Sequence, residues 1–166
     1  MRQVRNWLAA SIVLGALSGV LARADDEAKE EKVSLDKVPK AALDAVKAKF
    51  KDAKLVSAQT EKEDGKLVYE INLQHKGQTI EVTVTPDGKI VSIEKTIAAK
   101  DLPKEVAKTI ESKYPKATIE IAEEVTEGGK TNYEVLLALA DKKKVEVVLD
   151  PTGKILKEEK KEGKKD

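Results

Sequence analysis

The sequence contains no cysteine, and its 166 residues include only one histidine, one tryptophan and one phenylalanine. The absence of cysteine excludes disulfide bonds and thiolate metal ligands, so the fold must depend on apolar burial alone. His75, the only histidine, falls at the end of a predicted strand. A single imidazole cannot supply a Ser-His-Asp set or a multi-histidine metal centre. The chain also lacks a glycine-rich phosphate loop. These absences predict a protein that is not an enzyme and has no cofactor.

The first residues are typical of a secretory signal peptide. Arg2 and Arg5 precede an apolar run, and Ala22-Arg23-Ala24 places small residues at the two positions that determine cleavage. The run, residues 7–21, is shorter than the roughly 20 residues that span a bilayer. We therefore expect cleavage after Ala24, a periplasmic or secreted product, and no stable membrane anchor afterwards.

Charge is balanced, with 31 Lys+Arg against 30 Asp+Glu in the whole chain. Arg2, Arg5 and Arg23 are its only arginines, and residues 1–24 contain no acid, so cleavage leaves 28 basic against 30 acidic residues. Nucleic-acid binders are usually strongly basic and use arginine for bidentate contacts. Nucleic acid is therefore excluded as an expected partner.

The chain repeats itself at an offset of 64 to 65 residues. The recurring features are a proline that opens a helix, an aromatic residue that ends it, a Tyr-Glu pair and a glycine turn. They are Val38-Pro39 with Leu102-Pro103, Phe50 with Tyr114, Tyr69-Glu70 with Tyr133-Glu134, and Pro86-Asp87-Gly88 with Pro151-Thr152-Gly153. Self-similarity of this length indicates a folding unit that is present twice.

Each copy begins with a helix-forming pattern and continues with strands. Apolar residues recur every four positions over residues 38–50 and 102–114, which predicts amphipathic helices over 39–50 and 103–114. Residues 67–74 and 132–139 alternate with period two, as strands do. The turns at Asp64-Gly65 and Gly128-Gly129 predict hairpins.

These patterns predict an α+β fold: a tandem repeat of one helix plus a four-stranded antiparallel meander, with two helices packed on one face of a sheet of up to eight strands. The predicted boundaries are a signal peptide at 1–24, a charged linker at 25–34, repeat 1 at 35–97, repeat 2 at 98–160 and a disordered tail at 161–166. How the two halves of the sheet join stays open.

The repeated residues resemble the PepSY-like group, which includes the β-lactamase-inhibitor-like domains. The resemblance covers roughly residues 35–160. It implies an exported, non-catalytic binding module that binds or restrains an envelope or secreted protein, often a hydrolase. The inhibitory protein of that group presents aromatic residues from its concave sheet face, whereas the outward strand positions of this chain are mainly Glu, Asn, Thr and Gln.

The sheet face turned away from the helices is the predicted partner-binding surface. Alternation places ten residues on it: Glu70, Asn72, Glu81, Thr83, Asn132, Glu134, Leu136, Ala138, Glu146 and Val148. Leu136, Ala138 and Val148 are expected to form a modest exposed apolar patch, of the kind that marks a contact surface. An unpaired strand edge is a second possible contact.

Two alternatives remain open from the sequence. The acidic first hairpins, with Glu61, Glu63 and Asp64 in one copy and Glu123, Glu124 and Glu127 in the other, could make the chain a periplasmic metal or small-ligand binding protein. Lys62 interrupts the first cluster and no calcium-loop spacing is present, so a charged hairpin tip is the simpler interpretation. A structural or solvent-facing role is likewise the simpler interpretation of His75, because Leu139 takes its place in the second copy.

Overall fold

The structure, a computed structural model, describes residues 31–63, 65–141 and 143–161, apart from the side chains of Glu63 and Lys161. The predicted signal peptide, most of the predicted linker at 25–34 and the tail beyond Lys161 lie outside the described residues. Within the described residues, no helix is both long enough and apolar enough to cross a membrane.

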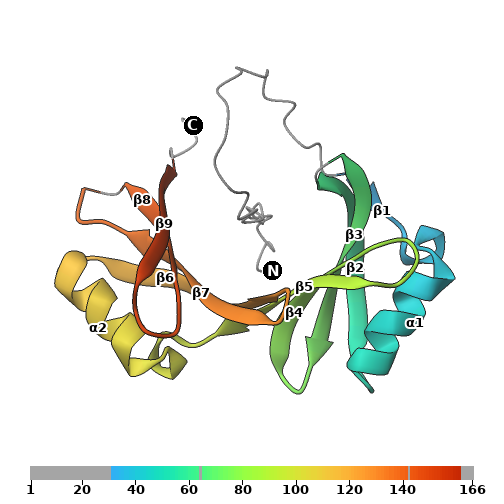
Figure 1. Cartoon of the computed structure of the whole chain (residues 1–166), viewed down its shortest axis with the longest axis horizontal. Coiled ribbons are helices and arrows are strands. Elements are labelled where there is room, and N and C mark those ends of the chain that lie inside the picture. Colours follow the sequence, from blue (N-terminus) through green and yellow to red (C-terminus); the bar gives the residue numbers. More distant parts are fainter. Residues whose placement is uncertain (1–30, 64, 142, 162–166) are drawn as a thin grey trace.

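Nine strands form one antiparallel sheet whose spatial order is the order of the chain. The strands are β1 (Glu31–Val33), β2 (Lys54–Glu63), β3 (Lys66–His75), β4 (Gln78–Val84), β5 (Ile90–Ile97), β6 (Thr118–Glu127), β7 (Lys130–Ala138), β8 (Lys144–Leu149) and β9 (Ile155–Lys161). The helices are α1 (Lys40–Lys49) and α2 (Lys104–Lys113), each preceded by a 3₁₀ turn, η1 (Leu35–Lys37) and η2 (Ala99–Asp101). Figure 1 shows the sheet curved, with both helices on its outer side at opposite ends.

The predicted fold class is wrong. We expected an α+β tandem of helix-plus-meander units with a sheet of up to eight strands, whereas the fold is mainly β, with a single nine-stranded sheet and two ten-residue helices. β1 adds the ninth strand by pairing with β2 over Glu31↔Thr60 to Val33↔Ala58, within residues that we expected to be linker. Pairing of β5 with β6, from Ile97↔Ala122 to Ser92↔Glu127, makes the two halves one continuous sheet.

The helices begin and end within one residue of the predicted limits. Pro39 and Pro103 are the N-cap residues, where a missing N–H is tolerated, and Phe50 and Tyr114 are the C-caps. The four-residue apolar period faces the sheet: Ala42 and Val46 of α1 are fully buried, as is Val106 of α2. Burial of this stripe, rather than intrinsic propensity, stabilises helices this short.

Two hydrophobic cores lie between the helices and the convex face of the sheet. The core beneath α1 contains Phe50, Tyr69, Ile71, Leu73, Ile80, Val82, Val84 and Ile93, and the core beneath α2 contains Ile110, Val135, Leu137, Val145, Val147 and Leu149. Ile93 of β5 belongs to the first core, and Ile97 of the same strand packs against the second. Strand β5 therefore connects the two cores.

A glycine turn brings the β4–β5 hairpin against α1 and the β8–β9 hairpin against α2. Gly153 has φ +83°, and a Cβ added there would lie 2.5 Å from the backbone oxygen of Glu105 in α2. The Thr109 hydroxyl donates a hydrogen bond of 2.9 Å to the Gly153 carbonyl. Gly88 makes the equivalent approach to α1, where an added Cβ would lie 2.7 Å from the backbone oxygen of Ala41. The repeated turn thus fixes each helix on the sheet by close backbone contact.

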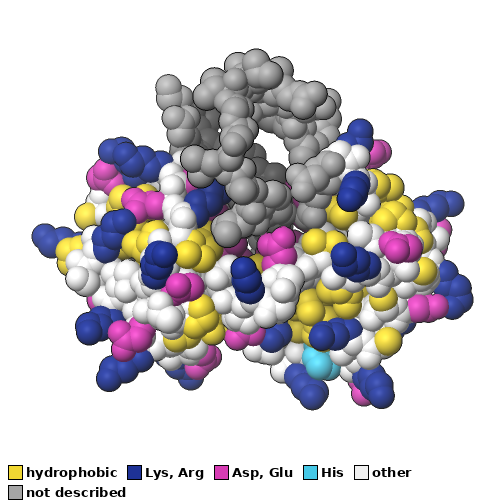
Figure 2. All heavy atoms as spheres, viewed as in Figure 1, with side chains coloured by type: hydrophobic (Ala, Val, Ile, Leu, Met, Phe, Trp, Pro, Cys, Tyr) yellow, Lys and Arg dark blue, Asp and Glu magenta, His cyan; other side chains and the backbone are white. Residues whose placement is uncertain are grey.

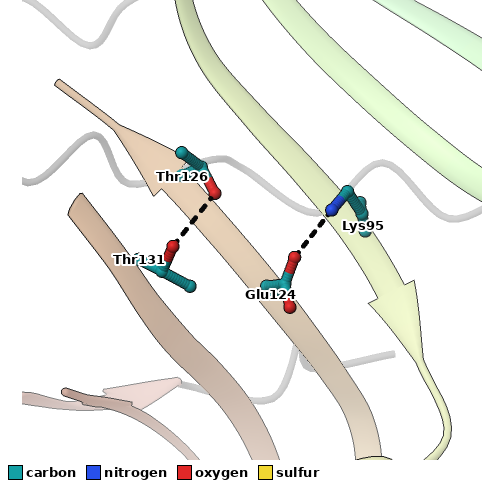
Figure 3. A network of polar contacts seen from close by, with 4 residues as sticks. All are labelled: Lys95, Glu124, Thr126 and Thr131. Carbon is teal, nitrogen blue, oxygen red and sulfur yellow. Dashed lines mark hydrogen bonds and ion pairs between the residues drawn. The ribbon is translucent and has the colours of Figure 1, made fainter. Parts of the chain in front are cut away.

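Polar contacts link β5, β6 and β7 at the centre of the sheet (Figure 3). Lys95 Nζ and Glu124 Oε1 lie 2.7 Å apart, and each side chain is about one-third exposed. The Thr126 and Thr131 hydroxyls lie 3.4 Å apart. Lys95 lies two residues from Ile93 and from Ile97 along β5, so its side chain is on the same face as theirs. Because Ile93 and Ile97 pack against the two cores, this ion pair lies on the convex side of the sheet.

Candidate functional site

The candidate site is the concave face of the sheet, opposite the helices. All ten predicted residues lie in strands, and none belongs to either helix-covered core. Glu70 and Asn72 are in β3, Glu81 and Thr83 in β4, Asn132, Glu134, Leu136 and Ala138 in β7, and Glu146 and Val148 in β8.

Strand register brings the predicted residues together as two sets of direct neighbours. In the first set Glu70 lies opposite Thr83 and Asn72 lies opposite Glu81. Asn72 Nδ2 donates a hydrogen bond of 2.8 Å to Glu81 Oε2. Directly opposed side chains on one face of an antiparallel pair have Cβ atoms roughly 5 Å apart, so these four side chains form one polar cluster.

The second set is the counterpart in β7 and β8. Glu134 lies opposite Val148, and Leu136 lies opposite Glu146. Leu136 is 5% exposed and Val148 1% exposed, so the exposed apolar patch predicted at these positions is wrong. The concave face is instead a surface where apolar and polar side chains are packed side by side.

Sequence reasoning missed the residues that connect the two sets. They belong to the central strands: Ser92 and Glu94 in β5, and Glu123 and Val125 in β6. Glu94 lies opposite Glu81 on one side and opposite Val125 on the other. The alternation of Ile93 with Glu94 could have placed Glu94 on the concave face. Its position at the centre of that face depends on the pairing of β5 with β6, which joins distant parts of the chain.

Carboxylates crowd this centre. Glu81 faces Glu94 across β4 and β5, and Glu123 faces Glu134 across β6 and β7. Like charges placed directly opposite each other destabilise a sheet. A fold that retains two such pairs side by side carries a local conflict, which is typical of functional sites.

Burial and this crowding change the acidity of Glu94. Burial raises the pKa of the Glu94 carboxyl to about 9, and the charges of Glu81, Glu134, Glu123 and Glu70 act in the same direction. The pKa of Glu123 is raised as well, chiefly by burial, while its hydrogen bond from Thr96 opposes the shift. At pH 7 Glu94 therefore carries a proton, so it can donate a hydrogen bond as well as accept one.

The other candidate residues have structural surroundings. His75 is at the end of β3, and its ring lies edge-on to Phe50 with the centroids 5.7 Å apart. Asp64 lies outside the described residues. The other acidic residues assigned to hairpin tips lie within the ten-residue strands β2 and β6, and Glu124 is paired with Lys95. In the part of the chain that the structure describes, no three His, Asp or Glu side chains are grouped so that they could hold a metal ion.

Two solved structures with similar folds come from Bacteroides. A BLIP-like protein from Bacteroides fragilis aligns with a TM-score of 0.63 and 20% identity, covering 77% of this chain and 90% of that one. A structure described as "putative periplasmic" from Bacteroides eggerthii aligns with a TM-score of 0.66 and 14% identity, covering 74% and 88%. At these identities the likeness shows the fold alone. A search of curated proteins finds no match.

Two family models match the chain, and together they span nearly all of its described residues. "Peptidase propeptide and YPEB domain" (PepSY) matches residues 32–94. "Putative beta-lactamase-inhibitor-like, PepSY-like" matches residues 78–157. The two matches are consistent with tandem copies of one kind of domain, and this kind of domain fits a non-catalytic protein-binding module. The chain belongs to the PepSY-like domain family.

Proposed function

We propose that this chain is an exported, non-catalytic binding module that holds an envelope or secreted protein against the concave face of its sheet. The observation that carries the proposal is the continuity of that face. Glu70, Glu81, Glu94, Glu123 and Glu134 lie on this face of five adjacent strands. Register places Glu81 opposite Glu94 and Glu123 opposite Glu134, and Glu70 lies opposite Thr83, two residues along β4 from Glu81. A curved sheet with helices only on its outer side leaves the inner side available to a partner.

The chemistry of the face supports binding rather than catalysis. Its side chains are carboxylates, amides, hydroxyls and small apolar groups, and His75 is on the other side, against Phe50. The described residues of this face contain neither a cysteine thiol nor a histidine that could activate a hydroxyl. Family membership also supports a non-catalytic binding module, and the predicted signal peptide supports export. The hydrolase that the sequence resemblance suggests as a partner is one class within this proposal.

Site-specific photocrosslinking tests the proposal. Leu136 and Val148 are buried, so lysine there would perturb folding as well as binding. Half-buried Asn132 and exposed Thr96 are better positions for a photoreactive residue, with exposed Lys108 on α2 as the matched control. We expect the chain, produced with its own leader in the envelope of its host, to crosslink one protein from the two concave positions and not from Lys108. Crosslinking from Lys108 alone, or from no position, would contradict the proposed face.

A further inference from the structure

The concave face contains a buried carboxylate that is only partly satisfied. Glu70 is 1% exposed. Its Oε2 accepts a hydrogen bond from Gln59 Nε2, whereas its Oε1 has no hydrogen-bond partner among the described residues. An unsatisfied buried acceptor costs roughly 1–3 kcal/mol, and more when it is charged. A donor that reaches Oε1 from outside the sheet would offset that cost.

Glu70 lies diagonal to Glu81, at the edge of the carboxylate cluster, and its Oε2 accepts a hydrogen bond from Gln59 on β2. Its charge is one of those that raise the pKa of Glu94, together with those of Glu81, Glu123 and Glu134. These five side chains come from β3, β4, β5, β6 and β7, which are all the strands that meet at the centre. The negative potential is therefore concentrated at one place on the face.

Lysine is abundant in this chain but is excluded from that place. Strands β3 to β7 contain three lysines. Lys66 and Lys130 are the first residues of β3 and β7, at the hairpin ends, and Lys95 is on the convex side, paired with Glu124. None of the three lies beside Glu70 and Glu94 at the centre of the face.

We propose that the carboxylates around Glu70 and Glu94 receive a lysine or arginine side chain from a basic segment of the captured protein. This inference rests on the proposed function and names the chemistry of its partner. Charge complementarity selects a cation, and the free Oε1 of Glu70 supplies an acceptor for one of its N–H groups. Val68, Val125 and Leu136 on the same face are apolar and buried, as suits the aliphatic stem of a long cationic side chain.

Binding of the cation is coupled to loss of a proton. Glu94 is protonated at neutral pH because of burial and of Glu70, Glu81, Glu123 and Glu134. A cation placed among these groups stabilises the ionised form and lowers the pKa of Glu94. Affinity should therefore rise with pH until the pH reaches about 9, the pKa of Glu94 in the unbound protein.

A fluorescent hexa-arginine peptide, titrated at constant ionic strength, tests the inference. We expect Glu70→Gln to weaken binding at least about tenfold, since a charge-assisted contact contributes about 1.4 kcal/mol or more. Glu123→Gln, at a partly exposed position, should also weaken binding and guards against misfolding of the Glu70 variant. Glu111→Gln, on the exposed surface of α2, should bind within about twofold of the wild type.

The pH profile separates a built site from general attraction between opposite charges. The wild type should bind more tightly at pH 8.5 than at pH 6, and Glu94→Gln should lose that dependence because glutamine has no proton to release. Equal losses in Glu70→Gln and Glu111→Gln, or no loss in the first, would overturn the inference. Spermine competing as well as the peptide, molecule for molecule, would also overturn the assignment to a protein segment.

The two proposals fail differently. If the concave positions crosslink a protein and the glutamine variants capture it as well as the wild type does, the cationic contact is wrong and the binding face stands. If neither concave position crosslinks a protein, the proposed function is wrong whatever the peptide does.

Discussion

Glu94→Gln should make the protein more resistant to unfolding at high pH. The carboxyl has an ordinary pKa of 4.5, and the fold raises it to about 9. Between these values the folded state holds a proton that the unfolded state has lost. The contribution of this group to stability is therefore fully present below pH 4.5 and is lost progressively as the pH rises towards 9.

The magnitude follows from the size of the shift. Each pH unit within this window removes about 1.4 kcal/mol of the free energy of unfolding. From pH 5 to pH 8 the loss from Glu94 is about 4 kcal/mol, and over the whole window it is about 6 kcal/mol. Glutamine keeps the shape and hydrogen-bonding groups of the protonated acid but does not titrate, so the variant avoids this loss.

Urea unfolding of wild type and variant at pH 5 and pH 8 measures the effect. The difference in unfolding free energy between the two proteins is compared at the two pH values, so that contributions common to both proteins cancel. The advantage of the variant should grow by about 4 kcal/mol between the two pH values. Glu111→Gln, an exposed change on α2, controls for the loss of one carboxylate. An advantage that is the same at both pH values within about 1 kcal/mol would refute the reasoning, because Glu94 would then ionise in the fold as easily as in the unfolded chain.

Two further predictions concern the frame that supports this face. Gly153→Ala should destabilise the protein by roughly 3 kcal/mol or more, as measured by urea unfolding, because it adds a clash with the Glu105 carbonyl to the strain of φ +83°. Gly129→Ala, at φ +78° with nothing within 4 Å, should cost only about 1–2 kcal/mol, and equal costs would contradict the close contact. A double-mutant cycle on Lys95 and Glu124, each changed to alanine, should give a coupling of about 1 kcal/mol or less that shrinks in high salt, since both side chains are about one-third exposed. A coupling above about 2 kcal/mol would mean that this pair is far less screened by solvent than its exposure indicates.

Local patterns predicted much of the structure. The helix limits were predicted because Pro39 and Pro103 precede regular four-residue apolar periods, and those stripes are buried as expected. Alternation also assigned Tyr69 and Glu70 to opposite faces: the ring of Tyr69 is in the core beneath α1, and Glu70 is on the concave side. These features depend only on residues close together in the sequence.

The errors arose where pairing between distant segments decides the result. β1 has three residues in a charged stretch and no alternation of its own, so only its partner β2 identifies it as a strand. Acidic residues such as Glu61 and Glu123 suggested a hairpin tip, but strong pairing extends β2 and β6 through them. Glu94 was missed because its importance comes from β6, a strand that begins more than twenty residues later.

The contrast between the two faces of β5 and β6 is the strongest argument that the carboxylate cluster is functional. On the convex face these strands bring Lys95 and Glu124 together as an ion pair. On the concave face, one residue away along each strand, they place Glu94 and Glu123, each with another glutamate directly opposite on the neighbouring strand. The chain therefore has lysines and a backbone geometry that accepts them, yet it places a lysine directly opposite Glu124 and a glutamate directly opposite Glu94 and opposite Glu123. A cluster selected for stability would resemble the convex arrangement, because opposed like charges weaken a sheet. Its persistence on the face without helices is what a surface completed by a partner's cation requires.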